Sequence, residues 1–347
     1  MSLSTRQQQI AAALLTGPTS LSELSQLSVF QGVTERTLQR DLSELLELGI
    51  ISRTGEARAT SYSVAPSGAV GITLTPEVLN KLFAQENRLA VPYDFTRLDF
   101  LASRELFSDS EIKQLTHFHD VFHQKLESAP ADIIRRERER ITIELSWKSS
   151  QFEGNTYSLL ETETLIKEGL VAQGKTKDET QMILNHKHAL DFSAENKHLF
   201  KGNLTVQTII DLHRHLAEGL FDYGIRERGV GITGSVYRPL ANKFKLEEEL
   251  QRLCDVINSK DSVFEKALLA FTYTCYLQAF NDGNKRTGRI LANALLYAYG
   301  SFPLSLRAVE VNIYKLAILA FYELGILGNA KLVLLDQAKF AAENYAI

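Results

Sequence analysis

The sequence contains few cysteines and no long uncharged apolar run. Of its 347 residues only two are cysteine, Cys254 and Cys275. Both lie in apolar stretches with helical periodicity, so we interpret them as buried thiols in a reducing compartment, not as a disulfide framework. The opening MSLSTRQQQ lacks the regions of a signal peptide, and no uncharged run approaches the ~18–20 residues that span a bilayer. We therefore expect a cytoplasmic protein without membrane association.

An excess of basic residues is also missing. The chain has 38 Lys and Arg against 42 Asp and Glu, a net charge of −4, which excludes general coating of nucleic acid but allows a local contact. No internal repeat or low-complexity tract is visible. Because domains usually contain ~100–200 residues, this length predicts more than one. We predict three parts: residues 1–65, 66–135 and 136–347.

The first part predicts three helices. An apolar stripe in residues 5–16 stops at Gly17-Pro18, which ends the first helix. Ser20 and Glu23 have the spacing of a capping box and start the second. VTERTLQRDLSELLELGI then predicts an amphipathic third helix, and IISRTGEARATSYSV predicts two short strands around a turn.

The stretch TERTLQRDL resembles the recognition helix of bacterial DeoR-like and related regulators. The resemblance implies a winged helix-turn-helix domain in residues 1–65, with DNA binding through residues 20–65. Residues 1–65 contain five basic and six acidic residues, so no strong electrostatic footprint supports DNA binding. A winged helix used for protein contacts or autoinhibition stays open as the alternative. The side chains that would face the groove are Thr34, Arg36, Thr37 and Arg40.

Residues 66–135 predict a helical connector that begins at PSGAV. Its second helix carries His117, His119 and His123. The cluster has no cysteine and no metalloprotease pattern, so we interpret it as a histidine-bearing helix face, not as a metal site.

Residues 136–347 predict a mainly α-helical domain with one interruption near residues 224–242. Within it, RERGVGITGSVYRPLAN predicts a β-hairpin around Gly234-Ser235. The segment RRERERITIELSWKSSQFEG predicts a helix that ends at Gly154.

The stretch QAFNDGNKRTGR joins two predicted helices, one over residues 263–279 and one from Lys285 to Tyr299. Its turn therefore lies at a helix N-terminus, where unpaired N–H groups and the helix dipole favour an anion. Gly283 allows a ligand to approach the backbone closely.

Arg286 and Arg289 are three positions apart and share a helix face beside this turn. Two guanidinium groups suit a polyphosphate, and Asp282 suits a bridging Mg²⁺. The residues alone leave two interpretations open: a magnesium–nucleotide pocket, or a capped helix with surface arginines.

FNDGNKRTGR resembles the Fic family signature His-Pro-Phe-x-Asp/Glu-Gly-Asn-Gly/Lys-Arg-x-x-Arg. A second family motif, Ser/Thr-x-x-x-Glu-Gly/Asn on an inhibitory helix, is matched by Ser149, Glu153 and Gly154. The resemblance covers roughly residues 140–340. The signature residues that match in order are Phe280, Asp282, Gly283, Asn284, Lys285, Arg286 and Arg289.

The resemblance implies a Fic-type helical bundle that moves AMP from ATP to a Ser, Thr or Tyr hydroxyl of a protein or of the chain itself. It implies Mg²⁺ on Asp282, the α-phosphate at Gly283 and Asn284, and the γ-phosphate on Arg289. Arg286 contacts phosphates and is a catalytic candidate. The implied nucleotide site comprises Phe280, Gly283, Asn284, Lys285, Arg286 and Arg289, and the implied target flap comprises Thr233, Gly234, Ser235 and Val236.

The resemblance also implies autoinhibition by Glu153. A carboxylate on Arg289 occupies the fork that a γ-phosphate needs, so the two compete. The alternative is an ordinary acid at a helix C-terminus before Gly154.

The chain departs from the family at the first motif position, where Gln278 and Ala279 replace His and Pro. A glutamine amide is no base near neutral pH, and a general base is typically worth ~10²–10⁴ in rate. For His213 and His215, in LHRHL, three interpretations stay open: one of them reaches the pocket, or they serve helix packing, or they are exposed at the surface. Three hypotheses follow: an autoinhibited AMP-transferase, a non-catalytic nucleotide-sensing DNA-binding regulator, and a plain interaction protein. A homodimer is compatible with each.

Overall fold

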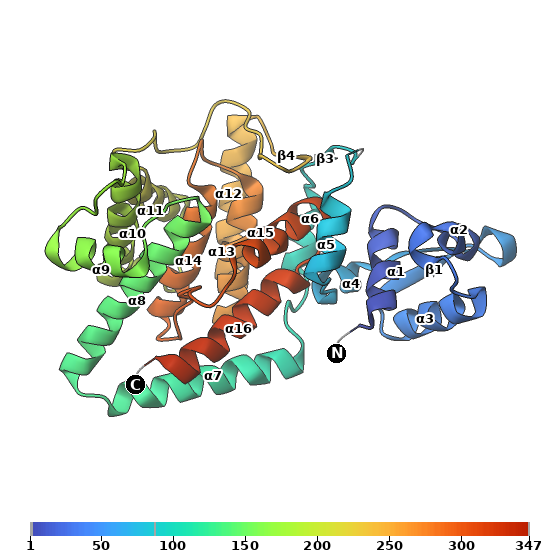
Figure 1. Cartoon of the computed structure of the whole chain (residues 1–347), viewed down its shortest axis with the longest axis horizontal. Helices are drawn as coiled ribbons and strands as arrows, with labels where there is room; N and C mark the ends of the chain where they lie inside the picture. The colour runs from blue at the N-terminus through green and yellow to red at the C-terminus, as the bar shows by residue number, and fades with distance from the viewer. Residues whose placement is uncertain (1–2, 87, 346–347) are drawn as a thin grey trace. The chain divides into compact units, whose positions relative to one another are not determined.

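The computed structural model describes residues 3–86 and 88–345 and is mainly helical, as predicted (Figure 1). It divides into two compact units, each assembled from segments that are distant in sequence. The first unit comprises Met1–Val91, Thr233–Tyr237 and Lys315–Leu332, and the second comprises Pro92–Ile232, Arg238–Tyr314 and Val333–Ile347.

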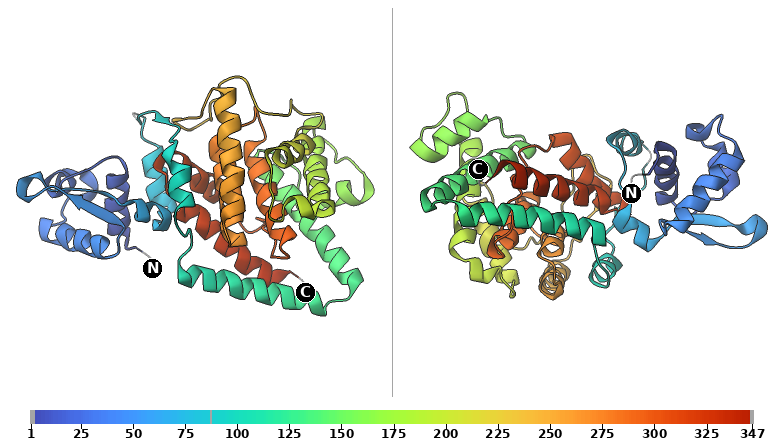
Figure 2. Two further views of the ribbon diagram at one scale, coloured as in Figure 1. Left: turned by 180° about the vertical axis from the view of Figure 1, so that it is seen from behind. Right: turned by 90° about the horizontal axis from the view of Figure 1, so that it is seen from below.

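The first unit opens with three helices and a two-stranded antiparallel sheet. Ser20 caps the second helix in a reciprocal capping box with Glu23, as predicted. The order of elements is that of the predicted winged helix-turn-helix, and DNA binding by it stays a prediction. The hairpin of the two strands extends beyond the helices of this unit (Figure 2). The elements are α1 (Thr5–Leu15), α2 (Leu21–Gln26), a 3₁₀ turn (Ser28–Phe30), α3 (Glu35–Glu47), β1 (Ile51–Thr54), a 3₁₀ turn (Ala57–Ala59) and β2 (Ser61–Val64).

Helix α1 is shared between two apolar clusters of this unit. Its Ile10 and Leu14 pack with leucines of α3. Its Ala11 and Ala12 pack instead with apolar residues that come partly from the C-terminal part of the chain, among them Leu316. The helices that join α1 in the second cluster are α4 (Pro66–Gly71), α5 (Pro76–Phe83) and α15 (Val311–Leu319), which continues as a π-helical turn (Ala320–Leu324).

Helices α13 and α14 lie at the centre of the second unit. Helix α14 packs against α13, α10 and α11, and α12 packs against α13. A Cβ on Gly288 of α14 would lie 2.9 Å from the Sγ of Cys275, so the glycine permits this close approach. The helices are α6 (Thr96–Ala102), α7 (Asp109–Ser128), α8 (Ala131–Phe152), α9 (Leu159–Glu168), α10 (Lys177–Glu195), a 3₁₀ turn (Lys197–Leu199), α11 (Val206–Ala217), α12 (Lys243–Ser259), α13 (Val263–Leu277), α14 (Asn284–Ala298) and α16 (Gly328–Asn344), whose last residues belong here.

The interruption near residues 224–242 is present, but its described residues do not form the predicted β-hairpin. Its one strand, β4 (Tyr237–Arg238), pairs with β3 (Val91–Pro92). Two side chains satisfy polar groups of the segment, one from elsewhere in the chain and one from within it. Glu323 accepts from the N–H of Val236, and Arg226 donates to the carbonyl oxygen of Leu240. These side-chain contacts replace the cross-strand bonds that a hairpin needs.

The structure shows the surroundings of the two cysteines and of His119. Cys254 and Cys275 are free and buried, as predicted, and burial raises the pKa of both thiols to about 12. His119 on α7 contacts the hydroxyl of Ser301, with 3.1 Å between Nδ1 and Oγ. Within residues 3–86 and 88–345, no group of three or more His, Cys, Asp or Glu side chains is placed to hold a metal. None of the described helices is both long and apolar enough to cross a bilayer.

Candidate functional site

The loop between α13 and α14 is closed by hydrogen bonds to Asn284. The Oδ1 of Asn284 accepts from the N–H of Phe280 at 2.9 Å. Its Nδ2 donates to the carbonyl oxygen of Phe280 at 2.8 Å and to the Oε1 of Gln278 at 3.2 Å. Helix α14 begins at this residue, one position before the predicted start, so its first N–H groups lie at the loop.

Gln278 ends α13 in the left-handed conformation, with a φ of 52°. This conformation costs a non-glycine residue roughly 1–2 kcal/mol. The side-chain amide offsets that cost, because its Nε2 donates to the carbonyl oxygen of Cys275 at 2.6 Å while its Oε1 accepts from Asn284. The amide thus bridges the end of one helix and the start of the next. It offers no site for a proton at neutral pH.

His213 supports the loop from α11. Its buried ring stacks on Phe280, with 3.8 Å between centroids and 9° between planes. Its Nε2–H donates to the carbonyl oxygen of Asp282 at 3.0 Å, and burial lowers its pKa to about 4. The structure therefore places His213 as a neutral packing residue of the loop. His215, on the same helix, contacts the ring of Phe192 instead.

Gly283 has a φ of 76° and leaves no room for a side chain. A Cβ there would lie 2.9 Å from Cζ of Phe221 and 3.3 Å from Nε2 of His213. The left-handed conformation therefore favours glycine here, and a Cβ would force the ring of Phe221 to shift.

Arg286 and Asp282 form an ion pair at the start of α14. The distance between NH2 of Arg286 and Oδ2 of Asp282 is 3.0 Å. The guanidinium is buried and lies 4.8 Å from the ring centroid of Phe221, whereas the Asp282 carboxylate is 64% exposed. The guanidinium of Arg286 is therefore fixed, whereas the carboxylate of Asp282 remains accessible to solvent.

Arg289 is fully buried and uses both edges of its guanidinium. Its Nε donates to the Oγ of Ser149 at 2.8 Å, and NH2 donates to the carbonyl oxygen of the same residue at 3.0 Å. NH2 also donates to Oε1 of Glu153 at 2.8 Å. NH1 donates to the hydroxyl of Tyr314 at 2.7 Å, a partner that the sequence did not indicate.

Glu153 lies at the C-terminal cap of α8 and meets two cations. Its Oε1 contacts Arg289, and its Oε2 lies 2.9 Å from Nζ of Lys285. Burial disfavours the charged carboxylate, but the attraction of the two cations outweighs it and lowers the pKa of Glu153 to about 2. Gly154 follows with a φ of 94° and turns the chain away from the helix axis. The predicted inhibitory residues and the last arginine of the loop motif thus meet in one buried cluster.

His186 on α10 orients the hydroxyl of Ser149 in this cluster. Its Nδ1 lies 2.7 Å from the carbonyl oxygen of Met182, which only accepts, so Nδ1 carries the proton. Nε2 therefore accepts from the hydroxyl of Ser149 at 2.7 Å, which leaves the lone pairs of that hydroxyl for the Nε–H of Arg289. Burial lowers the pKa of His186 to about 3, so this arrangement is stable at neutral pH.

Arg226 is a further buried cation that sequence reasoning missed. It donates from Nε to the carbonyl oxygen of Gln278 at 2.6 Å and from NH1 to that of Arg228 at 2.5 Å. It also lines a cavity of about 770 Å³ together with Asn281 of the loop and Tyr223. A single arginine within a polar loop segment gives no sequence signal for such a role.

The predicted flap residues, Thr233 to Val236, belong to the first unit. There the hydroxyl of Ser235 donates to Oε1 of Glu323 at 2.6 Å. The other oxygen of Glu323 pairs with Arg88. These residues are therefore anchored by a charged residue of the π-helical turn, and their role as a target flap stays a prediction.

The predicted DNA-facing residues lie along the start of α3. Thr34 caps the helix by accepting from the N–H of Thr37, and the two hydroxyls are 2.9 Å apart. Arg36 and Arg40 are exposed, and Nε of Arg40 lies 3.9 Å from Oε1 of Glu44. A role for these residues in binding DNA stays a prediction.

The sequence is similar to proteins named for AMP transfer. Residues 203–296 match the Fic/DOC family. The chain is 28% identical over 202 residues to "Protein adenylyltransferase Fic" of Nematostella vectensis, covering 56% of this chain and 47% of that protein. It is 27% identical over 231 residues to "Protein adenylyltransferase fic-1" of Caenorhabditis briggsae, covering 63% and 44%. The chain thus spans about half the length of the curated relatives it matches.

Solved structures share the fold. A Fic-domain-containing signalling protein from Bacteroides thetaiotaomicron matches with a TM-score of 0.52 and 21% identity, covering 67% of this chain and 97% of that one. Fic-1 of Caenorhabditis elegans matches with a TM-score of 0.56 and 18% identity, covering 100% of both chains. The helical fold expected from the two motifs is thereby confirmed.

Proposed function

We propose that this chain, whose residues 203–296 match the Fic/DOC family, binds ATP and transfers AMP to a hydroxyl group of a protein, and that Glu153 restrains the reaction. The observation that carries the proposal is the contact between Glu153 and Arg289 at 2.8 Å. A buried guanidinium next to a helix N-terminus suits a terminal phosphate, and here another anion, a carboxylate, already binds it. The names of the relatives support AMP as the group transferred.

The loop residues have the geometry for holding phosphates. The N–H groups at the start of α14 are oriented by the left-handed Gly283 and the internal bonds of Asn284. Arg286 contributes a second fixed guanidinium beside them. Lys285 becomes available to a phosphate once it no longer binds Glu153. In the proposed function these backbone donors and cations stabilise the negative charge of the phosphates.

Asp282 fits a magnesium ion shared with the nucleotide. Mg²⁺ in nucleotide sites is typically held by one or two carboxylates together with phosphate oxygens, and the Asp282 carboxylate is exposed. When bound there, the ion neutralises phosphate charge during transfer. For Asp282 to bind it, the ion pair with Arg286 must exchange for a metal contact.

Transfer is a displacement at the α-phosphorus of ATP. The acceptor oxygen bonds to phosphorus, pyrophosphate leaves, and the hydroxyl proton passes to water or to a phosphate oxygen, because Gln278 cannot take it. The side-chain amide of Gln278 is engaged with Cys275 and Asn284, so it maintains the loop. We expect slow transfer, lowered by about 10²–10⁴ relative to a site with a general base.

The engagement of Gln278 also favours a second candidate function. In it the pocket binds a nucleotide without transferring it, and the first unit reads DNA through α3. Residue 278 then serves only to hold the nucleotide loop in its closed shape.

The transfer of α-labelled ATP separates the two functions. The Glu153→Gly protein is incubated with cell lysate and with itself, with native Gln278 and with Gln278→His in parallel. Label on protein with native Gln278 supports the transferase. Label only after Gln278→His contradicts native transfer and supports the nucleotide sensor. Absence of label from both rejects AMP transfer by this site.

A further inference from the structure

The segment that carries Glu153 is attached to α10 at both of its ends. At the N-terminal end, Nε2 of His186 accepts from the Ser149 hydroxyl at 2.7 Å. At the C-terminal end, Nδ2 of Asn155 donates to the carbonyl oxygen of Glu179 at 2.7 Å. Helix α10 therefore contacts the chain on either side of the inhibitory carboxylate.

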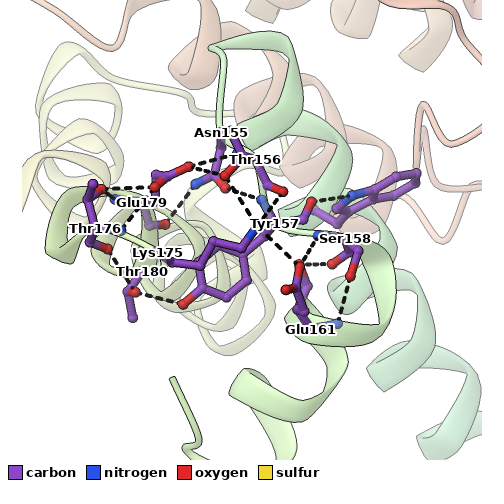
Figure 3. Close-up of polar contacts among 11 residues, drawn as sticks. Asn155, Thr156, Tyr157, Ser158, Glu161, Lys175, Thr176, Glu179 and Thr180 are labelled. Carbon is purple, nitrogen blue, oxygen red and sulfur yellow. Dashed lines mark hydrogen bonds and ion pairs between the residues drawn. The ribbon is translucent and has the colours of Figure 1, made fainter. Parts of the chain in front are cut away.

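The C-terminal attachment centres on Thr156 and the Glu179 side chain, as Figure 3 shows. Oε1 of Glu179 accepts from the N–H of Thr156 at 2.9 Å and from its hydroxyl at 2.6 Å. Nζ of Lys175 donates to the carbonyl oxygen of Thr156 at 2.7 Å. We call the contacts of Thr156 with Glu179 and Lys175 the Thr156 clasp. It uses every backbone polar group of one residue.

Glu179 has two functions at once. Its Oε2 accepts from the N–H and hydroxyl of Thr176, the N-cap of α10, while Oε1 serves Thr156. Hydrogen bonds from the Thr156 hydroxyl and from the backbone lower the pKa of Glu179 to about 2. The carboxylate is thus charged at neutral pH, and its hydrogen bonds are of the stronger, charge-assisted kind.

Tyr157 continues the attachment into the interior. Its ring is buried in an apolar cluster with Leu165 and Ile183, and its hydroxyl lies 2.7 Å from Oγ1 of Thr180 on α10. Its carbonyl oxygen accepts from Nε1 of Trp147 on α8 at 3.0 Å. The inhibitory helix, the loop after it and α10 are therefore linked by one connected set of bonds.

The two attachments differ in their access to solvent. Ser149, His186 and Arg289 are fully buried, whereas Thr156 is exposed and Glu179 is partly exposed. Between the two lies Gly154, whose φ of 94° marks a point where the backbone turns. Asn155 and Tyr157, on either side of Thr156, are buried, so the contacts of Thr156 are the part of this attachment that can open first.

We propose that the Thr156 clasp sets how firmly Glu153 blocks the nucleotide site, so that loosening this exposed contact on α10 releases the inhibition. The proposal rests on the proposed function and names its regulation. Thr156 and Glu179 are positioning residues, since they act on the nucleotide site through Glu153.

Two substitutions open the clasp in different ways. Thr156→Val removes one hydroxyl and leaves the cap of α10 intact. Glu179→Gln retains only one acceptor oxygen for the two threonines. Asp178→Asn is the matched control, because Asp178 shares the first turn of α10 and its loss alters the helix dipole equally without touching Thr156.

Two measurements on the full chain report the effect. Hydrogen exchange of the ligand-free protein should rise about 10-fold across residues 150–157 in both clasp variants and stay unchanged in Asp178→Asn. ATP titrated by calorimetry should bind roughly 3- to 10-fold more tightly to the clasp variants than to the wild type. In the Glu153→Gly background the clasp substitutions should not increase ATP affinity further, because the carboxylate that they release is absent.

The outcomes separate the clasp from the proposed function. If exchange is unchanged in both variants, or rises while ATP affinity rises only in Glu153→Gly, the clasp does not control Glu153. If Glu153→Gly itself leaves ATP affinity unchanged, autoinhibition of the nucleotide site is wrong. Hydrogen exchange across residues 150–157 then still shows whether the Thr156 clasp holds that segment in place. Tighter binding that persists in the Glu153→Gly background shows that the clasp acts elsewhere and overturns the proposal.

Discussion

The carboxylate of Glu153 and the guanidinium of Arg289, 136 residues apart in the sequence, meet at 2.8 Å in a buried cluster. Ser149 holds the same guanidinium through its hydroxyl and its carbonyl oxygen. An arginine fixed in this way cannot turn to another anion unless the carboxylate leaves. The structure thus places a carboxylate on the guanidinium that the proposed function assigns to a phosphate of the nucleotide.

Arg289→Lys tests the phosphate site. Lysine keeps the positive charge but loses the planar fork that binds two oxygens. In the Glu153→Gly background we expect ATP affinity, measured by calorimetry, to fall at least about 10-fold. Arg214→Lys, at an exposed arginine paired with Asp211, is the control. Equal affinity in both variants contradicts the assignment of Arg289.

Gln278→His tests the role of the first motif residue. A histidine can act as the base that the amide cannot, so transfer of labelled AMP in the Glu153→Gly background should speed up by about 10²–10⁴. ATP affinity should change far less than the rate, because the phosphate contacts come from other residues and Gln278 acts on them only through the loop. A large change in affinity with no change in rate would mean that residue 278 shapes the pocket only.

Gly283→Ala tests how tightly the loop packs. Gly283 and Gly300 have φ values of 76° and 69°, but only the first would place a Cβ near other atoms, 2.9 Å from Phe221. Backbone strain should lower the free energy of unfolding by about 1 kcal/mol in both alanine variants. In Gly283→Ala the contact with Phe221 should lower it by about 1–3 kcal/mol more. Urea denaturation measures both. Equal losses show that Phe221 moves aside freely.

His186 makes stability sensitive to acid. Its pKa is lowered from 6.5 to about 3 by burial, so below about pH 6.5 the unfolded chain binds a proton that the native protein does not. The free energy of unfolding therefore falls as the pH drops towards about 3, by about 1.4 kcal/mol per pH unit from this residue. His186→Gln removes this contribution. Between about pH 6.5 and 4.5, denaturation curves of the two proteins should converge by about 2–3 kcal/mol. Parallel curves contradict a neutral, buried His186.

Much of the site could be predicted from local sequence. The apolar stretches before and after QAFNDGNKRTGR have the period of helices. This pattern predicts two helices and a loop at the N-terminus of the second one. The meeting of Glu153 with Arg289 came from the resemblance, because no local pattern pairs residues that far apart. For His213 the structure excludes surface exposure, because the ring is buried and stacks on Phe280 of the loop.

Other features depend on tertiary contacts that leave no local signal. The sequence of residues 226–242 has hairpin composition, yet its polar groups find partners on Glu323 and within the loop through Arg226. His186 belongs to a helix with ordinary periodicity, and only the fold places it behind Ser149. The partner of Lys285 was likewise unpredicted, since the resemblance assigned that residue to the nucleotide.

The most direct test of the central claim is ATP binding to the wild type, Glu153→Gln and Glu153→Gly by calorimetry at two pH values, about 5.5 and 8. The low pKa of Glu153 keeps its carboxylate charged at both. We therefore predict weak binding by the wild type and at least about 10-fold tighter binding by both variants, by the same factor at each pH. Equal affinity in all three proteins would contradict the claim that Glu153 competes with a nucleotide phosphate for Arg289.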